Sequence, residues 1–179
     1  FVLANLMGCE DDSNSAATPQ LSSKALLGEQ LYTDKNLSLN RTQSCATCHN
    51  PAHGFIDERT NDASRDTGHG LVASAGSLGD NQISIGDRNA PTAAYAAFSP
   101  EFHQGTRERS IVLQRFGAYQ GFIGGQFWDG READLKGQAG GPPTNPDEMA
   151  MPSKAAVVER LLEDDAYVAG FEYVYGADI

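Results

Sequence analysis

The chain has 179 residues, 40% of them hydrophobic, which is enough for one folded domain with its own core. Thirteen Lys and Arg residues stand against 24 Asp and Glu, and a formal net charge of −11 argues against a surface that follows nucleic-acid phosphates. No apolar run reaches the roughly 18 to 20 residues that a membrane-spanning helix needs. We therefore expect an acidic folded domain that does not bind nucleic acid.

The N-terminus resembles the end of a secretion signal. Residues 1–8, "FVLANLMG", are mainly apolar, and "LMGC" ends at Cys9 as a bacterial lipobox does, where the cysteine becomes the lipidated first residue of the mature protein. The alternative is an unmodified thiol in an N-terminal tail. We expect residues 1–20 to be a signal remnant and flexible tether with a lipid anchor at Cys9, and the folded domain to span 21–179.

Helical patterns recur from residue 21 onward. We expect four helices: residues 21–33 with Ser22 or Ser23 as cap, one that starts near Pro91, one capped by Ser153, and one over 165–176. Nineteen glycines and eight prolines cluster between the apolar runs, residues 57–87 show no periodicity, and strand signals are few. The pattern predicts an all-α domain with short helices and long loops.

The stretch "SCATCHN" at residues 44–50 carries the clearest chemical motif. A C-x-x-C pair alone occurs in zinc sites, thioredoxin-type redox pairs and disulfides, but a zinc site needs a second ligand pair and the thioredoxin motif needs a βαβ context, and the sequence supplies neither. The histidine that follows makes the motif C-x-x-C-H, which attaches c-type haem. We expect Cys45 and Cys48 to form thioethers and His49 to be the proximal iron ligand. Because haem c is attached outside the bacterial cytoplasmic membrane, we expect a periplasmic protein.

Five short segments resemble, in the same order, the bacterial di-haem cytochrome c peroxidase and MauG family: "LGEQLYTDKNLS", "SCATCHN", "RNAPT" at 88–92, "QFWDGR" at 126–131 and "GQAGGPPTNPDEM" at 137–149. The resemblance covers most of residues 25–175. It implies a c-type cytochrome fold and a periplasmic enzyme that reduces hydrogen peroxide to water with two haems in two domains. Only the first C-x-x-C-H is in this chain, so the resemblance implies the N-terminal half, which holds the peroxidatic haem, without the second haem domain.

The resemblance also assigns roles to single residues. Glu148 matches the family's acid–base glutamate and Gln138 its companion amide, and a carboxylate above the haem is suited to moving a proton between the peroxide oxygens. Trp128 matches the tryptophan that carries electrons between the haems, whereas most tryptophans only pack in a core. Asn89 matches an asparagine that helps to bind a calcium ion, although it could equally cap a helix before Pro91.

The histidines leave the sixth iron ligand open. His69 best matches the loop histidine that occupies this position in many family members, but its distance from "RNAPT" is longer than usual and MauG-like members lack the ligand. His103 is a second candidate, and His53 is expected at the surface or near a haem propionate. Met149 and Met151 could ligate iron, but methionines beside a catalytic loop more often pack.

The expected partners are hydrogen peroxide and a small redox protein of the cytochrome c or cupredoxin type, and the family resemblance also implies a homodimer. Two other functions stay open at this point. One is a MauG-like oxidase that acts on a protein substrate. The other is a non-enzymatic electron-transfer module with a permanently filled sixth iron position.

Overall fold

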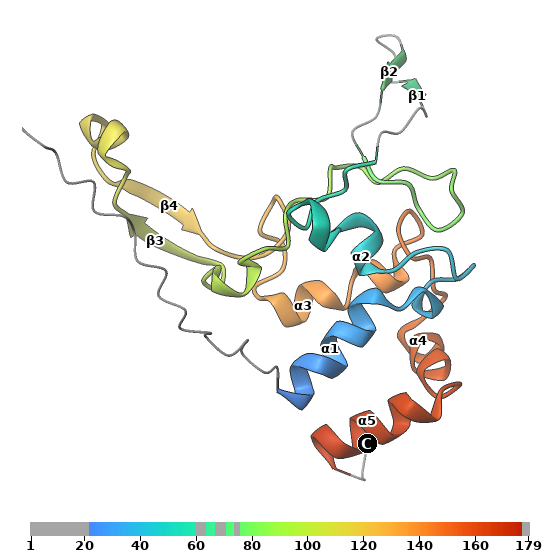
Figure 1. The fold of residues 1–179 in the computed structure, drawn as a ribbon. Helices are drawn as coiled ribbons and strands as arrows, with labels where there is room; N and C mark the ends of the chain where they lie inside the picture. Colours follow the sequence, from blue (N-terminus) through green and yellow to red (C-terminus); the bar gives the residue numbers. More distant parts are fainter. Residues whose placement is uncertain (1–21, 60–63, 67–70, 74–75, 177–179) are drawn as a thin grey trace, which may run out of the picture.

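The fold is taken from a computed structural model that describes residues 22–59, 64–66, 71–73 and 76–176. Figure 1 shows a body of short helices joined by loops, from which two β-hairpins project, a short one at the top and a longer one at the left. The α-helices are α1 (Ser23–Thr33), α2 (Cys45–Cys48), α3 (Leu135–Ala139), α4 (Lys154–Leu161) and α5 (Asp165–Tyr175). Turns of 3₁₀ helix are η1 (Lys35–Leu37), η2 (Pro51–His53), η3 (Ala96–Phe98), η4 (Ile111–Phe116) and η5 (Pro142–Thr144).

Capping residues fix the starts of the three longest helices. The side-chain oxygens of Ser22, Ser153 and Asp164 each accept a hydrogen bond from a backbone N–H two or three residues further on, at 2.8 to 3.3 Å. Such bonds satisfy donors that the first helical turn leaves free. The last helix ends before Gly176, whose φ of +100° a side chain would disfavour. The predictions for these three helices are confirmed.

The helix expected near Pro91 does not form. Only η3 follows it, after Tyr95 with φ +63°, and residues 89–93 have no regular structure. Thr92 donates its hydroxyl to the carbonyl oxygen of Gly54 at 2.6 Å, and the Ala93 N–H donates to that of Phe55 at 3.2 Å. These two donors bind the loop after α2 instead of taking part in the backbone hydrogen bonds of a helix. This tertiary contact overrides the local helix propensity.

The core of the described body is small and lies where the N-terminal and C-terminal helices meet. Its buried apolar side chains are Leu27, Leu37, Met149, Met151 and Tyr167. Because a Cβ at Gly170 would already lie 3.3 Å from a Leu27 methyl carbon, α5 approaches α1 closely. Arg160 of α4 donates to the carbonyl oxygens of Asn36 and Leu39 at 3.3 and 3.1 Å. Helix α4 therefore holds η1 and the residues that follow it.

Two antiparallel hairpins correct the all-α expectation. Strand β1 (Ser64–Asp66) pairs with β2 (Leu71–Ala73), and β3 (His103–Arg107) pairs with β4 (Tyr119–Ile123) with Gly105 opposite Gly121. The second hairpin, residues 103–123 with η4 at its tip, is called the arm below. It points away from the helical body in Figure 1. Among the described residues, no helix is long and apolar enough to cross a membrane.

Candidate functional site

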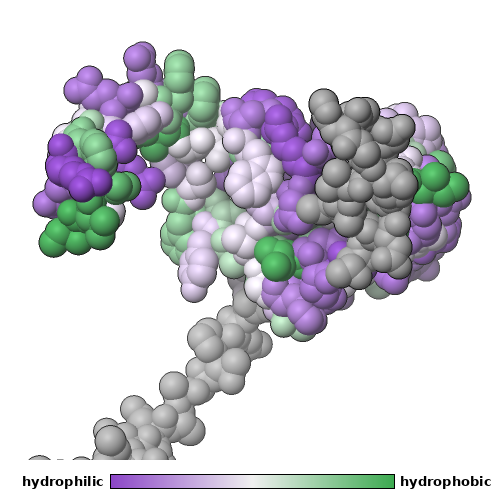
Figure 2. All heavy atoms as spheres, turned by 90° about the horizontal axis from the view of Figure 1, so that it is seen from above, coloured by the Kyte–Doolittle hydropathy of each residue, from purple (hydrophilic) through white to green (hydrophobic). Residues whose placement is uncertain are grey.

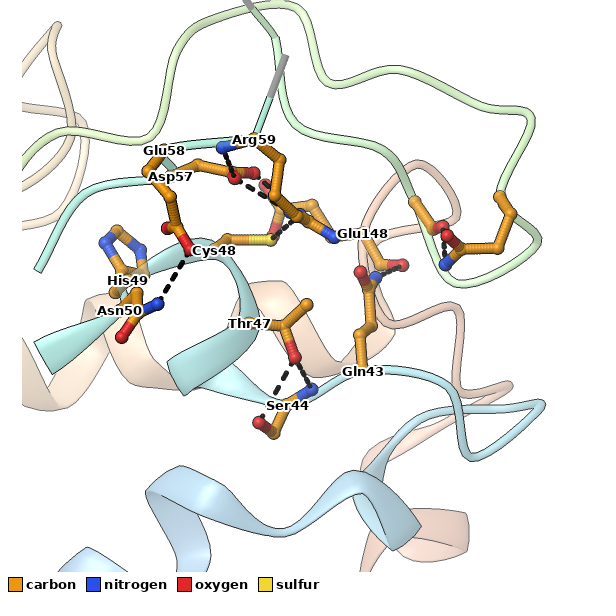
Figure 3. Close-up of polar contacts among 12 residues, drawn as sticks. Gln43, Ser44, Thr47, Cys48, His49, Asn50, Asp57, Glu58, Arg59 and Glu148 are labelled. Atoms are coloured by element: carbon orange, nitrogen blue, oxygen red, sulfur yellow. Dashed lines mark hydrogen bonds and ion pairs between the residues drawn. The ribbon is translucent and has the colours of Figure 1, made fainter. Parts of the chain in front are cut away.

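Helix α2 is a single turn formed by the C-x-x-C segment. Ser44 precedes it, and its N–H donates to the Thr47 hydroxyl at 2.9 Å, which fixes the start of the turn (Figure 3). Residues three apart on a helix share a face, so Cys45 and Cys48 lie on one side of α2. Both thiols are half-buried and free, and burial raises the pKa of each. Two protonated thiols on one helical turn suit thioether attachment and disfavour a redox disulfide pair.

His49 caps the C-terminal end of this turn. Its Nδ1 lies 3.3 Å from the carbonyl oxygen of Phe55, and the Tyr32 hydroxyl of α1 donates to the His49 carbonyl at 2.6 Å. Burial, followed by the nearby Cys45 and Cys48, raises the pKa of Tyr32 to about 12, so this hydroxyl stays a donor. A carbonyl partner at Nδ1 leaves Nε2 to bind a metal. The ring therefore has the arrangement of an iron ligand.

A paired cation lies beside the second cysteine. The Arg59 guanidinium is 2.6 Å from the Asp57 carboxylate and 3.5 Å from the Cys48 sulfur (Figure 3). Burial acts to raise the pKa of Asp57, but the hydrogen bonds from Arg59 outweigh it and hold that pKa below its usual range. Asp57 is therefore ionised, and its negative charge balances the positive charge of Arg59. The pair beside Cys48 has no net charge.

The loop of residues 145–152 between η5 and α4, called the Glu148 loop below, is fixed to the segment that enters α2. The carbonyl oxygen of Glu148 accepts hydrogen bonds from the backbone N–H of Asp80, at 2.7 Å, and from the side-chain amide of Gln43 (Figure 3). The Leu39 N–H donates to the next carbonyl, that of Met149, at 2.9 Å. Gln43 is only 1% exposed, so its amide has no water to compete for this bond. The loop and the haem motif therefore hold a fixed relative position.

Asp80 completes this arrangement from the buried side. Its carboxylate accepts from the Asn40 N–H and side-chain amide, at 2.8 and 2.6 Å, and from the Thr42 hydroxyl at 2.7 Å. Burial acts to raise the pKa of Asp80, but these bonds outweigh it and lower the pKa. A Cβ at Gly79 would lie 2.7 Å from the backbone oxygen of Asp147, so this approach requires glycine.

Glu148 itself has the environment of a proton-transfer group. Its side chain is half-buried, and burial raises its pKa, as does the neighbouring Asp147, while the charge of Arg131 acts in the opposite direction. Burial is the main cause of the raised pKa of Cys45 and of Cys48, and the Glu148 charge adds a smaller contribution to both. Carboxyl groups with raised pKa values that face a cofactor position are typical of acid–base catalysts.

Two of the sequence motifs meet at Trp128. The indole Nε1 donates to the Asn89 carbonyl at 2.9 Å, and Asp129 pairs with Arg88 at 2.9 Å and with Arg131 at 3.0 Å. The Arg88 hydrogen bond is the largest of the effects that lower the pKa of Asp129 to about 2. Trp128 is 65% exposed, so it does not pack in the core of the described chain. It lies on a turn that is fixed by ion pairs.

The structure does not bring every predicted residue to this site. Gln138 lies in α3, which packs against η5 just before the Glu148 loop, but no described hydrogen bond joins its side chain to Glu148. His103 lies exposed on the arm with Nδ1 2.7 Å from the Glu101 oxygen, away from α2 in Figure 1. His53 is exposed, 3.8 Å from a Glu58 oxygen. His69 and Cys9 lie outside the described residues, so their predicted roles stay predictions.

The calcium prediction also stays a prediction. The described part of the chain holds no group of three or more His, Cys, Asp or Glu side chains that could bind a metal ion. The backbone oxygen of Asn89 accepts the hydrogen bond from the Trp128 indole.

Three residues that organise the site were missed from the sequence: Tyr32, Gln43 and Asp80. Tyr32 lies within the segment "LGEQLYTDKNLS", and Gln43 directly precedes "SCATCHN". Their position at segments that resemble the family was the available signal for a role in the site. Asp80 lies in a stretch without periodicity. A lone acidic residue there is ordinarily a solvated charge, so nothing in the sequence distinguishes it.

Comparison with known proteins agrees with this geometry. The family profile described as di-haem cytochrome c peroxidase matches residues 22–179. Methylamine utilization protein MauG of Paracoccus denitrificans is 48% identical over 163 residues, which are 91% of this chain and 37% of the relative. Cytochrome c peroxidase Ccp of Escherichia coli is 33% identical over 157 residues, which are 88% of this chain and 25% of the relative. The crystal structure of the diheme peroxidase BthA from Burkholderia thailandensis superposes with a TM-score of 0.65 at 28% identity, over 89% of this chain and 33% of that one.

The motif, the raised-pKa carboxyl and these matches define the class as c-type haem oxidoreductases. The chain belongs to the di-haem cytochrome c peroxidase family, whose members include the MauG proteins and whose cofactor is haem c. It spans between 25% and 37% of the length of these relatives. The residues present fit this cofactor, since α2 offers two free thiols on one face and His49 has its Nε2 available.

Proposed function

We propose that this chain binds one haem c through Cys45, Cys48 and His49, and that the site it forms reduces hydrogen peroxide to water. The observation that carries the proposal is Glu148. Its carboxyl group is half-buried with a raised pKa, its charge acts on both cysteine sulfurs, and its backbone is bound to the segment that leads into α2. A mobile surface carboxylate would have none of these features.

Glu148 performs the proton transfer that peroxide cleavage needs. In its carboxylate form it accepts the proton of one peroxide oxygen and returns it to the other, which leaves as water. Two electrons and two further protons complete the conversion of one peroxide into two waters. When bound, the haem supplies the iron that exchanges electrons with peroxide. The bonds from Gln43 and Asp80 to the Glu148 carbonyl keep the carboxyl group at a constant distance from α2.

The remaining roles in the proposal rest on the sequence resemblance and the family. Gln138 would hold peroxide or a water by its amide, and Trp128 would pass electrons from a second haem. Asn89 would help to bind calcium. The electrons would come from a small redox protein of the cytochrome c or cupredoxin type, in the periplasm. An anchor at Cys9 and a homodimer belong to the same proposal.

A second candidate function is a MauG-like oxidation of a protein substrate. The identity of 48% with a MauG protein, against 33% with a cytochrome c peroxidase, favours it. Both functions use peroxide chemistry at the same site, so Glu148 has the same task in each. They differ in the electron source, which is a redox protein in the first and the substrate protein in the second.

The test is Glu148→Gln in the complete haem-loaded protein, which keeps the side-chain shape and removes the base. We expect the rate of peroxide consumption with a reduced donor to fall by about 10²- to 10⁴-fold, with unchanged haem content. Glu159→Gln on the exposed side of α4 is the matched control and should leave the rate unchanged. A parental rate in the Glu148→Gln protein would contradict the proposed mechanism.

A further inference from the structure

The arm combines exposed aliphatic side chains with a fixed base. At its tip, η4 exposes Ile111 by 82% and Val112 by 76%, with Leu113 and Phe116 also exposed. Clusters of this kind are uncommon on surfaces that meet only water. Figure 2 shows the consequence at the left of the molecule, where green apolar and purple charged side chains lie side by side over one projecting lobe.

The base of the arm is rigid. The Phe102 and Phe122 rings stack with centroids 5.2 Å apart, and the Phe102 N–H donates to the Ala133 oxygen at 3.2 Å. Gly124 has φ +78°, and a Cβ there would collide with the backbone oxygens of Pro100 and Glu101. The hairpin is therefore held in a fixed direction, with its apolar tip extended away from the body.

The charges on the arm are unusual for this protein. Every other arginine whose side chain is described pairs with a carboxylate: Arg41 with Glu163, Arg59 with Asp57, Arg88 and Arg131 with Asp129, and Arg160 with Glu163. Arg107, Arg109 and Arg115 have no ion pair among the described residues; Arg107 and Arg109 precede η4, and Arg115 lies in its last turn. A chain of net charge −11 thus places three arginines without an ion pair around one apolar tip, where Glu108 is the single acidic residue of the arm.

The guanidinium groups also lie against the rings of the arm. Arg115 is 4.7 Å from the centroid of Phe116 and Arg109 is 5.8 Å from that of Tyr119. The Nε of Arg109 is buried without a hydrogen-bond partner among the described residues. Arginine stacked on an aromatic ring still presents its planar donors to phosphate oxygens.

We propose that the tip of the arm docks the protein on an anionic phospholipid surface. Ile111, Val112, Leu113 and Phe116 would enter the boundary between headgroups and acyl chains, and the three arginines would bind lipid phosphates at the headgroup level. Among the described residues the arm is the part suited to such a surface, because anionic lipid would repel the net negative charge of the rest of the protein. The inference is independent of the proposed catalysis.

The form of the tip favours lipid over a protein partner. A lipid surface can accommodate a projecting hairpin tip without a preformed groove. It offers phosphate groups at its surface and acyl chains beneath them, which match the arginines and the apolar side chains of the tip. The main competing occupant is the part of the protein outside this chain, which would cover the tip as an ordinary apolar contact.

The test uses the complete haem-loaded protein with Cys9→Ser, which removes the predicted acylation site. Flotation is measured with vesicles of phosphatidylcholine alone and of equal parts phosphatidylcholine and phosphatidylglycerol, at low and high salt. We expect binding to the anionic vesicles that weakens with salt. Changing Arg107, Arg109 and Arg115 to Gln should weaken binding about 100-fold, and Ile111→Ser with Phe116→Ser at least about tenfold.

The matched control is Val158→Ser with Leu162→Ser, an exposed apolar pair on α4 and its C-cap, which should bind as the parent does. No flotation with anionic vesicles, or equal flotation of the tip variants, would overturn the inference. So would binding to the soluble polyanion heparin without binding to vesicles, which would show an ionic surface only. A Tm of the Ile111→Ser, Phe116→Ser protein several degrees below that of the control would show that the rest of the protein covers the tip, and would also overturn it.

Discussion

The Glu148 loop and the arm are built in opposite ways. The loop is bound to distant parts of the sequence by Gln43, Asp80 and the backbone of Leu39, and the side chains of Gln43 and Asp80 are buried. The arm is held by its own strand ladder and its base, and most of its side chains face outward. The comparison indicates that long-range polar contacts hold Glu148 in position in the body, while the arm can take part in a separate interaction.

The first prediction concerns the cysteines of α2, where we expect the largest difference between the two regions. Changing both Cys45 and Cys48 to Ser removes both thioether sulfurs, so no haem should remain bound after acid–acetone extraction. Haem is measured in the extracted protein by the pyridine haemochrome spectrum. A variant of the arm, Ile111→Ser, serves as the control and should keep its haem. Covalent haem in the double variant would show that α2 is not the attachment site.

The second prediction tests the long-range hold on Glu148. Gln43→Leu removes the buried donor to the Glu148 carbonyl, so the loop can shift relative to α2, and the peroxide turnover rate should fall about 10- to 100-fold. Gln126→Leu is a matched control, because the Gln126 amide also donates to a backbone oxygen, that of Ala96 at 3.1 Å, but at the base of the arm. It should leave turnover unchanged. Equal losses in both variants would indicate a general structural effect rather than positioning.

Sequence patterns predicted the helical body well because its helices carry local signals. Ser22 and Ser153 are capping residues beside apolar stripes, and both cap the helices where expected. Strand β3, by contrast, reads His-Gln-Gly-Thr-Arg and has neither alternation nor a buried face. Its pairing with β4 depends on a partner strand more than ten residues away, which a local pattern does not reveal.

Sequence analysis predicted the site residues that belong to a recognisable motif and missed those that do not. The prediction for Cys45, Cys48 and His49 follows from their spacing, and in the structure His49 has the Phe55 carbonyl as a partner at Nδ1. Gln43 and Asp80 act through backbone atoms of a loop more than sixty residues further along the chain. No periodicity encodes such contacts, because they depend on the tertiary structure alone.

The third prediction uses two glycines to compare crowded and open backbone. Gly79→Ala would place its Cβ 2.7 Å from the Asp147 backbone oxygen, so the Glu148 loop must shift, and the free energy of unfolding should fall by about 1 to 3 kcal/mol. In Gly28→Ala, within α1, the added Cβ would have no atom within 4 Å, so the free energy of unfolding should rise by about 0.5 to 1 kcal/mol. Urea unfolding measures both. A destabilised Gly28→Ala protein or an unaffected Gly79→Ala protein would contradict the described packing.

The fourth prediction concerns pH. Burial raises the pKa of Glu148 and the charge of Arg131 lowers it, so Arg131→Gln should raise that pKa further. Because Glu148 must be ionised to accept a proton, activity should then be lost at a higher pH as the solution is acidified. The acid limb of kcat/KM against pH measures the shift. Arg115→Gln on the arm removes the same charge far from Glu148 and should leave the limb in place, and a shift toward lower pH in Arg131→Gln would exclude Glu148 as the base.

The last prediction is the smallest effect and asks whether the arm contributes to the body at all. Arg107 and Tyr119 are paired across the two strands, so replacing residues 108–118 by Asn-Gly joins them through a two-residue turn of the favoured type. The replacement removes η4 and its exposed apolar side chains but leaves the stacked Phe102 and Phe122 at the base. Since the removed segment has no extensive packing against another element of the described chain, the free energy of unfolding should change by less than about 1 kcal/mol, and peroxide turnover should equal that of the parent. Urea unfolding and turnover are measured on the complete haem-loaded protein. A large loss of either would show that the tip supports the catalytic body, and the separation between the two regions would then fail.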